Sequence, residues 1–216
     1  MYVILLGLPG AGKGTQAALL KDETGLVHVT TGELFRENIL LGTDLGKQAQ
    51  PFVESGRLVP DEITIGMLLD RITQPDCAGG CMLDGFPRNT EQARALDEAL
   101  AADGKRIDRA VYIRVATDEL VRRLAGRWSC PNCGAVYHET NEPPRVDGVC
   151  DNCGSQLTQR VDDQPDVVRT RIEVNLKNLE PLLDYYRELG KLCEANGEAG
   201  IAEVTRAVRL CLEGER

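Results

Sequence analysis

The sequence predicts a doubly wound α/β fold around a parallel sheet. Short apolar runs, among them Val3–Leu6, alternate with segments of helical periodicity, as in proteins whose parallel strands are joined by helices. The first run ends at Gly7, in a glycine-rich loop that leads directly into a helical segment. With 216 residues, 42% of them hydrophobic, the chain can bury one substantial core and carry small additional modules.

Four apolar runs are expected to be strands, because each is a short hydrophobic segment of the kind that is buried on both faces of a sheet. They are residues 3–6, the start of "VHVTTGELFRENILLG", "CMLDG" at 81–85 and "AVYIRV" at 110–115. Helices are expected at residues 12–24, from residue 31, and at 45–54, 61–73, 89–102 and 117–124. The core candidates of the first helix are Ala17, Leu19 and Leu20, and Thr31 is the expected N-cap of the second.

Residues 127–163 interrupt this alternation of strands and helices. The segment is rich in Pro, Gly, Asn and Cys and poor in large aliphatic residues, which indicates a separate small module. A long helix is expected after it, capped by Asp163 or a neighbour. Pro165 falls in its first turn, where a missing N–H removes no hydrogen bond. Pro181 is expected to kink or break this helix.

Charge and hydropathy exclude several classes of partner. The formal charge of −9 and the pI of about 4.9 argue against a nucleic acid, whose backbone is itself polyanionic. No stretch reaches the roughly 18 apolar residues of a membrane span, and "MYVILLG" lacks the basic start and the length of a signal peptide. We therefore expect a cytoplasmic protein that interacts with neither nucleic acid nor membrane and binds anions through local positive groups.

The glycine-rich loop "GLPGAGKGTQ" has the composition of a phosphate cradle. Its glycines allow successive backbone N–H groups to turn toward an anion, the following helix presents its positive end, and Lys13 adds a full charge. A tight turn alone would account for one or two glycines but not for Lys13. Gly14 stands where the usual motif has Ser or Thr, and Thr15 comes one residue later, so a direct hydroxyl contact with Mg²⁺ is not expected.

Two C-x-x-C pairs predict a structural metal site. Cys130 and Cys133 are followed, after sixteen residues, by Cys150 and Cys153. Four thiolates fill a tetrahedral zinc site and leave no open position for catalysis, and zinc would supply folding free energy that so small a module lacks. A thioredoxin-like redox pair is the alternative, but one such pair does not predict a second. Iron also fits four tetrahedral sulfurs.

The remaining cysteines and the histidines receive no chemical role. Cys77, Cys81, Cys193 and Cys211 are expected to be reduced and buried as small hydrophobic residues. His28 and His138 are isolated in the sequence, and neither is assigned to catalysis.

Several arginines beside glycines or turn residues indicate binding of further phosphate groups. A guanidinium group grips phosphate at two points and stays charged when water is excluded, which suits the transfer of a phosphoryl group. Without their sequence context, Arg36 and Arg57 would be assigned to surface ion pairs. The candidates are Arg36, Arg57, Arg88, Arg127, Arg160 and Arg171.

With these motifs in sequence order, the chain resembles the adenylate kinases of the long bacterial type, which have a zinc-binding lid. The resemblance rests on "GLPGAGKGTQ", "TTGELFR", "SGRLVPDE", "LDGFPRNTEQ", "LAGRW", "YHETNEPP" and "QRVDDQPDVVRTR", which span nearly the whole length. It implies a P-loop nucleoside monophosphate kinase fold with a five-stranded sheet. It also implies reversible, Mg-dependent phosphoryl transfer from ATP to AMP, giving two ADP, by a monomer.

The resemblance also implies a division of the chain. The core would comprise residues 1–29, 60–126 and 164–216, with an AMP-binding insertion at 30–59 and the zinc-binding lid at 127–163. Closure of the insertion and the lid would exclude water from the reacting groups.

The site residues carry over by position. The resemblance assigns ATP to Gly10, Ala11, Gly12, Lys13, Gly14, Thr15, Arg123, Arg127, Val136, Tyr137 and Ala199. It assigns AMP to Thr31, Arg36, Arg57, Leu58, Val59, Gly85, Phe86, Pro87, Arg88, Gln92, Arg160 and Arg171. The catalytic set is Lys13, Asp84, Arg88, Arg127, Arg160 and Arg171, and the zinc ligands are Cys130, Cys133, Cys150 and Cys153.

Two of these assignments have independent support from residue chemistry. Asp84 ends an apolar strand, as a magnesium-organising carboxylate does, and we expect it to act on Mg²⁺ through water. The amide of Gln92 can donate and accept at once, which complements the N7 and N6 edge of adenine. The chain departs from the family pattern at Asn89, where threonine is common, at Arg57, where many relatives have lysine, and at Trp128, where a basic residue often follows Arg127.

Three other functions remain open at this point. Another nucleoside monophosphate kinase, acting for example on UMP, shares the glycine loop and "DGFPR" but usually has a short lid. A kinase that uses GTP as donor and AMP as acceptor is a close variant. A zinc-ribbon ATPase that binds nucleic acid is disfavoured, because the lid has four acids and no basic stripe: Glu139, Glu142, Asp147 and Asp151.

Overall fold

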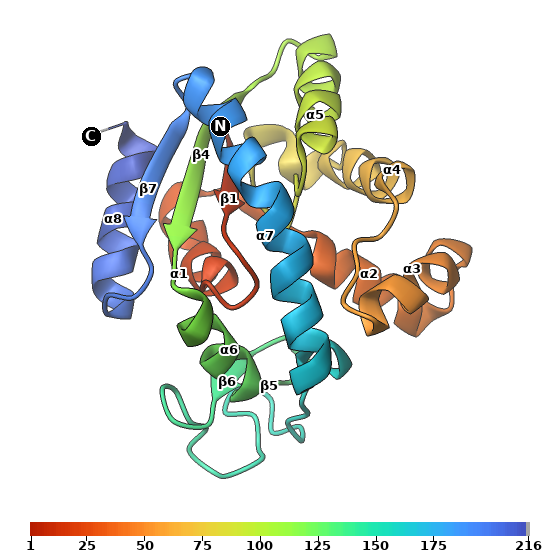
Figure 1. The fold of residues 1–216 in the computed structure, drawn as a ribbon, viewed down its shortest axis with the longest axis vertical. Helices are drawn as coiled ribbons and strands as arrows, with labels where there is room; N and C mark the ends of the chain where they lie inside the picture. Colours follow the sequence, from red (N-terminus) through yellow and green to blue (C-terminus); the bar gives the residue numbers. More distant parts are fainter. Residues whose placement is uncertain (215–216) are drawn as a thin grey trace.

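The computed structural model describes residues 1–214, and within them the main sheet has five parallel strands in the order β2-β3-β1-β4-β7 (Figure 1). This confirms the predicted fold class. The strands are β1 (Tyr2–Leu6), β2 (Val27–Thr30), β3 (Cys81–Asp84), β4 (Ile107–Arg114) and β7 (Leu192–Asn196). All residues of β1 are buried, and its neighbours align with it in parallel register, with Val3 opposite Met82 and Ile4 opposite Leu83. Burial of such side chains contributes about 1.5–3 kcal/mol each.

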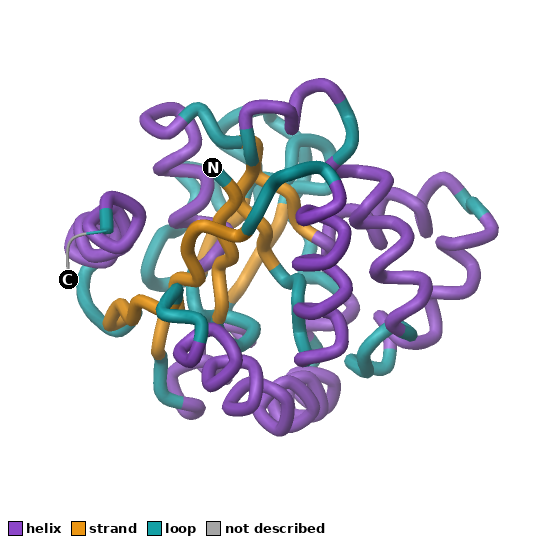
Figure 2. Tube along the Cα trace, turned by 90° about the horizontal axis from the view of Figure 1, so that it is seen from above, coloured by secondary structure: helices purple, strands orange, loops and turns teal. Residues whose placement is uncertain are grey.

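Helices cover both faces of the sheet (Figure 2). On one face α1 (Lys13–Thr24) packs against α8 (Ile201–Glu213), and on the other α7 (Pro165–Glu188) packs against α5 (Thr90–Ala102), which contacts α4 (Asp61–Ile72). The other helices are α2 (Thr31–Leu41), α3 (Asp44–Glu54), α6 (Thr117–Ala125) and two 3₁₀ turns, η1 (Pro75–Gly79) and η2 (Val161–Asp163). None of the helices in the described chain has the length and apolar character needed to cross a membrane.

The strand order places a crevice at the carboxyl ends of β1 and β3. The chain leaves β1 through α1 toward β2 on one side, and it leaves β3 through α5 toward β4 on the other. Neighbouring strands whose connections diverge in this way leave a gap at their carboxyl ends, where ligands of open α/β sheets bind. The glycine loop after β1 and Asp84 at the end of β3 therefore meet at this edge.

Two small hydrophobic clusters lie apart from the main core. One joins α2 and α3 through Phe35 and Ala49, with Val59. The other lies in the lid, where β5 (Arg127–Ser129) pairs antiparallel with β6 (Val136–His138), and contains Cys130, Tyr137, Cys150 and Leu157. The clusters fall within residues 30–59 and 127–163, and the division of the chain into moving parts stays a prediction.

Several local expectations were wrong. Leu19 is 46% exposed and does not belong to the core. Thr31 is the first residue of α2 rather than its N-cap, and its hydroxyl donates to the carbonyl of Gly85, so a long-range contact takes the place of a cap. For Pro181 only the alternative of a break was wrong, because α7 runs without interruption from Pro165 to Glu188, and the kink stays a prediction.

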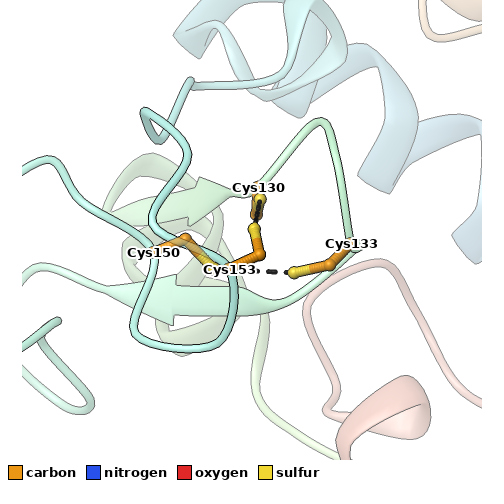
Figure 3. A group of neighbouring side chains, drawn as sticks. All are labelled: Cys130, Cys133, Cys150 and Cys153. Carbon is orange, nitrogen blue, oxygen red and sulfur yellow. Dashed lines mark hydrogen bonds between the residues drawn. The ribbon is translucent and has the colours of Figure 1, made fainter.

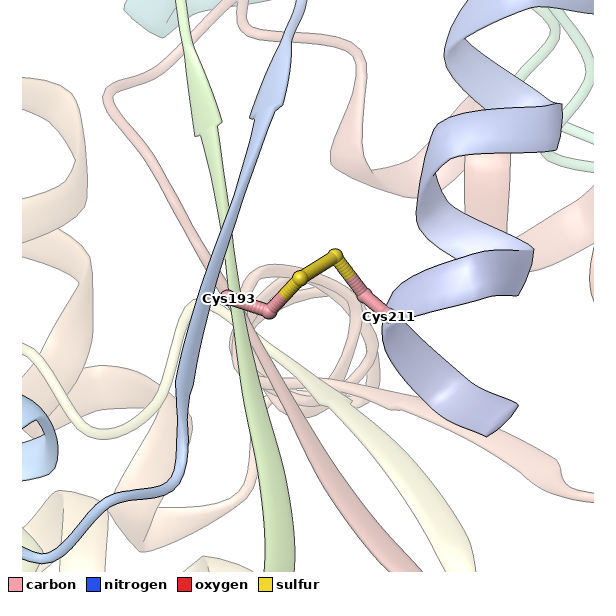
Figure 4. The surroundings of a disulfide bond; sticks show 2 residues. All are labelled: Cys193 and Cys211. Carbon is pink, nitrogen blue, oxygen red and sulfur yellow. A yellow bond between two sulfur atoms is a disulfide. The ribbon is translucent and has the colours of Figure 1, made fainter. Parts of the chain in front are cut away.

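The expectation of four reduced, buried thiols outside the lid was also wrong. Cys193 in β7 and Cys211 in α8 form a disulfide across a sequence separation of 18 (Figure 4). Sequence spacing gave no signal for this pair, because only the packing of α8 on β7 brings their Cα atoms to 5.6 Å. Cys77 and Cys81 are free and buried, as expected.

The disulfide is expected to stabilise the C-terminal part of the core. Closing a loop of this length in the unfolded chain corresponds to about 3 kcal/mol, and for a chain of this size to a melting temperature higher by roughly 6–12 °C. Calorimetry of the oxidised protein against the Cys193→Ser/Cys211→Ser variant measures the difference. Dithiothreitol should lower the melting temperature of the wild-type protein only, and so bring the two melting temperatures closer together. Equal melting temperatures of the two oxidised proteins would contradict the prediction.

Candidate functional site

The glycine loop closes on itself around Lys13. Gly10 and Gly12 have φ angles of 86° and 90°, which residues with a side chain rarely adopt. Gly12 leads directly into α1. The Nζ of Lys13 donates to the carbonyls of Gly7 at 2.9 Å and Leu8 at 3.1 Å, so the ammonium group lies back over the loop. Burial lowers the pKa of Lys13. The arrangement has the parts of a phosphate cradle, which are a glycine-rich loop with backbone N–H groups, a helix N-terminus and one cation.

Asp84 faces this cradle from the end of β3. Its carboxylate lies 3.8 Å from the Lys13 ammonium and 3.5 Å from Nε2 of His28. Burial acts to raise the pKa of Asp84, but Lys13 and His28 outweigh it and hold that pKa below its usual value. Asp84 is therefore ionised at neutral pH and is an oxygen ligand of the kind that Mg²⁺ prefers, whereas Thr15 is exposed on α1. The donor set fits a magnesium ion that accompanies a nucleotide.

A buried carboxylate organises the arginines beside the cradle. Asp163, with 0% of its side chain exposed, accepts two bonds from Arg127, at 2.8 Å and 2.5 Å, and a third at 2.9 Å from Arg171. Arg171 also lies 3.1 Å from the carboxylate of Asp162. The first residue of β5 and the second turn of α7 are thus joined through η2, and two guanidinium groups are held within reach of one acid.

Three further arginines crowd the same region. Burial is the main cause that lowers the pKa of Arg88 to about 10 and of Arg160 to about 10, and neighbouring guanidinium groups add to the effect. Burial likewise lowers the pKa of Arg36. All three stay charged at neutral pH, so the crevice concentrates positive charge in a chain that is acidic as a whole. Such a crevice favours ligands with several negative charges.

A pocket between the insertion and the core gathers most of the predicted acceptor residues. The predicted residues that line it are Arg36, Arg57, Leu58, Val59, Arg88, Gln92 and Arg171. Thr31 and Gly85 lie next to it, because the Gly85 carbonyl accepts hydrogen bonds from Thr31 and from Nε of Arg88. Arg160 does not line it and instead donates to Ser129 in the lid. Phe86 and Pro87 are buried and are not among its lining residues.

The residues predicted for the donor base come from α6 and from the loop after β7. Arg123 of α6 donates to the carbonyl of Gly197 at 3.0 Å and to Glu119 at 2.7 Å, and Ala199 is half-buried in the same loop. In the lid Val136 is exposed, but the Tyr137 side chain lies against Cys150 in the small lid core. The Tyr137 side chain is therefore buried in the lid core, with its hydroxyl against the Cys150 sulfur.

The four lid cysteines form one cluster (Figure 3). Their Sγ atoms all lie within 4.8 Å of one another, with 3.4 Å between Cys130 and Cys153 and 3.5 Å between Cys133 and Cys150. Tetrahedral zinc with bonds of about 2.3 Å separates its sulfur ligands by about 3.8 Å. The cluster fits a four-thiolate metal centre, and its geometry suits a structural rather than a catalytic ion.

Sequence reasoning missed the carboxylates that position the arginines. Asp163 was considered only as a helix cap, and Asp162 and Glu119 were not considered. The repeated acid in "VDDQPD", close to Arg160, was an available signal, because buried arginines need carboxylate partners. Asp61 was also missed, and it holds Gln92 through a bond of 2.6 Å.

Comparison with known proteins identifies the family of the chain. A sequence model described as adenylate kinase matches residues 5–191. The chain is 51% identical to an adenylate kinase of Streptomyces griseus over 95% of its own length and 94% of the relative's. It is 48% identical to one from Exiguobacterium sibiricum over 100% of both chains, and 47% identical to one from Oceanobacillus iheyensis over 99% of both. The chain belongs to the adenylate kinase family.

Proposed function

We propose that the chain catalyses reversible transfer of the terminal phosphoryl group of ATP to AMP, giving two ADP. The observation that carries this function is the pairing of a phosphate cradle at the end of β1 with an arginine-lined pocket beside it. Two anionic nucleotides can then approach end to end, and transfer between them needs positioning and charge neutralisation more than covalent chemistry. The family membership supports the same reaction.

On the donor side, the loop from Gly10 to Thr15 would hold the ATP phosphates through backbone N–H groups. Lys13 would move from its carbonyl partners to the phosphate oxygens. Arg123, with Ala199, would bind the adenine, and Val136 and Tyr137 would add contacts from the lid. Magnesium, when bound with ATP, would neutralise phosphate charge, and Asp84 is the carboxylate that would orient it through water.

On the acceptor side, Arg36, Arg57 and Arg88 would bind the AMP phosphate in the pocket. Gln92 would read the adenine edge, with the other predicted acceptor residues around it. Arg127, Arg160 and Arg171 would neutralise the migrating group, because each guanidinium is held by hydrogen bonds and would act where closure expels water. Asp163 would keep two of them aligned before substrates bind.

The insertion at 30–59 and the lid at 127–163 would close over the core, formed by residues 1–29, 60–126 and 164–216. Closure would expel water, which otherwise competes with AMP as acceptor. The four lid cysteines would hold zinc, which would stabilise the lid fold and take no part in the transfer. We further propose that the protein acts as a cytoplasmic monomer in adenine nucleotide balance and salvage, and binds neither nucleic acid nor membranes.

A coupled assay of ADP formation tests the reaction. Purified protein with MgATP is offered AMP, UMP, CMP or GMP, and a second series replaces ATP by GTP with AMP as acceptor. We expect AMP to be the preferred acceptor and ATP an efficient donor. If another monophosphate is preferred, that nucleotide replaces AMP as the proposed acceptor. Failure to form ADP from ATP and AMP in a metal-replete sample would overturn the proposal.

A further inference from the structure

We propose that Asp61 and Asn89 are positioning residues that lock the side-chain amide of Gln92 in one orientation and so select a 6-amino purine as acceptor. The inference rests on the proposed function, since it concerns which base the acceptor pocket takes. Gln92 lies in the first turn of α5 and lines that pocket, although only 1% of the residue is exposed.

Both polar atoms of the Gln92 amide have partners within the protein. Its Oε1 accepts the backbone N–H of Arg88 at 2.8 Å. Its Nε2 donates to Oδ1 of Asp61 at 2.6 Å. Asp61 comes from the first turn of α4, so the amide is held between two segments that are far apart in the sequence.

These partners permit only one orientation of the amide. An ionised carboxylate only accepts hydrogen bonds, and a backbone N–H only donates. Rotating the Gln92 amide by half a turn would set its oxygen against the carboxylate and its NH₂ group against the N–H of Arg88. Both contacts would become repulsive in a buried place, where unmade polar interactions are most unfavourable.

Asn89 fixes Asp61 in turn. Its Nδ2 donates to both carboxylate oxygens of Asp61, at 2.9 Å and 3.2 Å. Its Oδ1 accepts the backbone N–H of Gln92 at 2.8 Å and caps α5. A threonine at this position could supply the cap but has no NH₂ group for Asp61. Asparagine therefore connects the helix cap to the carboxylate that locks the amide.

A locked amide discriminates between purines at their 6 position. Like its N7 and N6 edge, the N1 and N6 edge of adenine presents an acceptor and a donor, which one fixed amide can satisfy with its donor and its acceptor together. A 6-oxo purine presents the reverse pattern on its N1 and O6 edge, a donor at N1–H and an acceptor at O6. An amide that can rotate would match this reversed pattern, with its NH₂ group on O6 and its oxygen on N1–H, whereas a locked one cannot. The network is therefore a specificity device for adenine against hypoxanthine or guanine.

The test compares Asp61→Asn and Asn89→Thr with wild type, using AMP and IMP as acceptors. Asparagine at position 61 can donate as well as accept, so it no longer opposes the reversed orientation of Gln92, which only the N–H of Arg88 still disfavours. We expect the ratio of kcat/KM for AMP to that for IMP to fall about tenfold in Asp61→Asn and by a smaller factor in Asn89→Thr. The KM for AMP should rise while the KM for ATP stays unchanged.

Asp70→Asn is the matched control, because it makes the same chemical change on the exposed side of α4. It should retain wild-type selectivity. If Asp61→Asn proves unstable by thermal melting, the selectivity between AMP and IMP is measured instead in Asn89→Ser, which keeps a capping oxygen but has no NH₂ group for Asp61. Selectivity within twofold of wild type in folded variants would overturn the lock. Loss of the proposed function would appear differently, as absence of AMP phosphorylation by the wild-type protein.

Discussion

Replacing Arg127 with alanine is expected to lower kcat by about 10³-fold or more while the fold stays intact. An arginine that neutralises charge on a transferring phosphoryl group contributes about 10³–10⁵ in rate. Arg127 is placed for that task, because both arms of its guanidinium are fixed by Asp163 at the start of the lid. Steady-state kinetics with saturating ATP and AMP, together with a far-ultraviolet circular dichroism spectrum, measure the effect.

Two further variants make this prediction specific. Arg127→Lys keeps the charge but loses the two-pronged geometry, so it should recover only a small part of the rate. Arg122→Ala removes an exposed arginine of α6 that pairs with Glu119, and it should keep near-normal turnover. A rate for Arg127→Ala within tenfold of wild type would remove Arg127 from the catalytic set.

Replacing Cys150 with serine is expected to abolish metal binding and unfold the lid. The lid core consists of four buried residues, two of which are metal-ligand candidates, so it buries too little apolar surface to fold alone. A structural zinc site contributes on the order of 10 kcal/mol to such a module. Because the lid carries Arg127 and Arg160, its loss should lower kcat by about a hundredfold or more.

Metal analysis and kinetics on the same preparation check this second prediction. The wild-type protein should contain about one zinc or iron atom per chain, and Cys150→Ser almost none. Cys77→Ala removes a buried thiol outside the lid and should retain the metal and the activity. Full activity of a metal-free Cys150→Ser protein would show that the lid folds without an ion.

The parts of the fold that sequence reasoning predicted were those with short-range signals. The strands predicted at 3–6 and 81–85 are short apolar runs, and the glycine loop follows one of them directly, so each could be placed without knowledge of the tertiary structure. Edge strand β7 carries no such signal, because it is only partly buried and Glu194 and Asn196 interrupt its apolar pattern. Strand β7 and helix α8 were accordingly not assigned from the sequence.

The candidate site was predicted where residue type and spacing determine the chemistry. The cysteine quartet is the clearest case, since two C-x-x-C pairs imply a tetrahedral centre. Contacts between distant segments could not be predicted in this way. Asp163 reads locally as a helix cap, and its role as the carboxylate between Arg127 and Arg171 depends on how η2 packs against α7.

The position of the single tryptophan gives the lid a built-in optical signal. Trp128 is 38% exposed in β5 and pairs with Tyr137, whose hydroxyl contacts Cys150 at 3.5 Å. Trp128 is thus the strand partner of a residue that contacts the sulfur cluster, and it belongs to the lid sheet rather than to the core sheet. Fluorescence of the unlabelled enzyme should therefore follow metal loss from the lid, separately from unfolding of the rest of the chain.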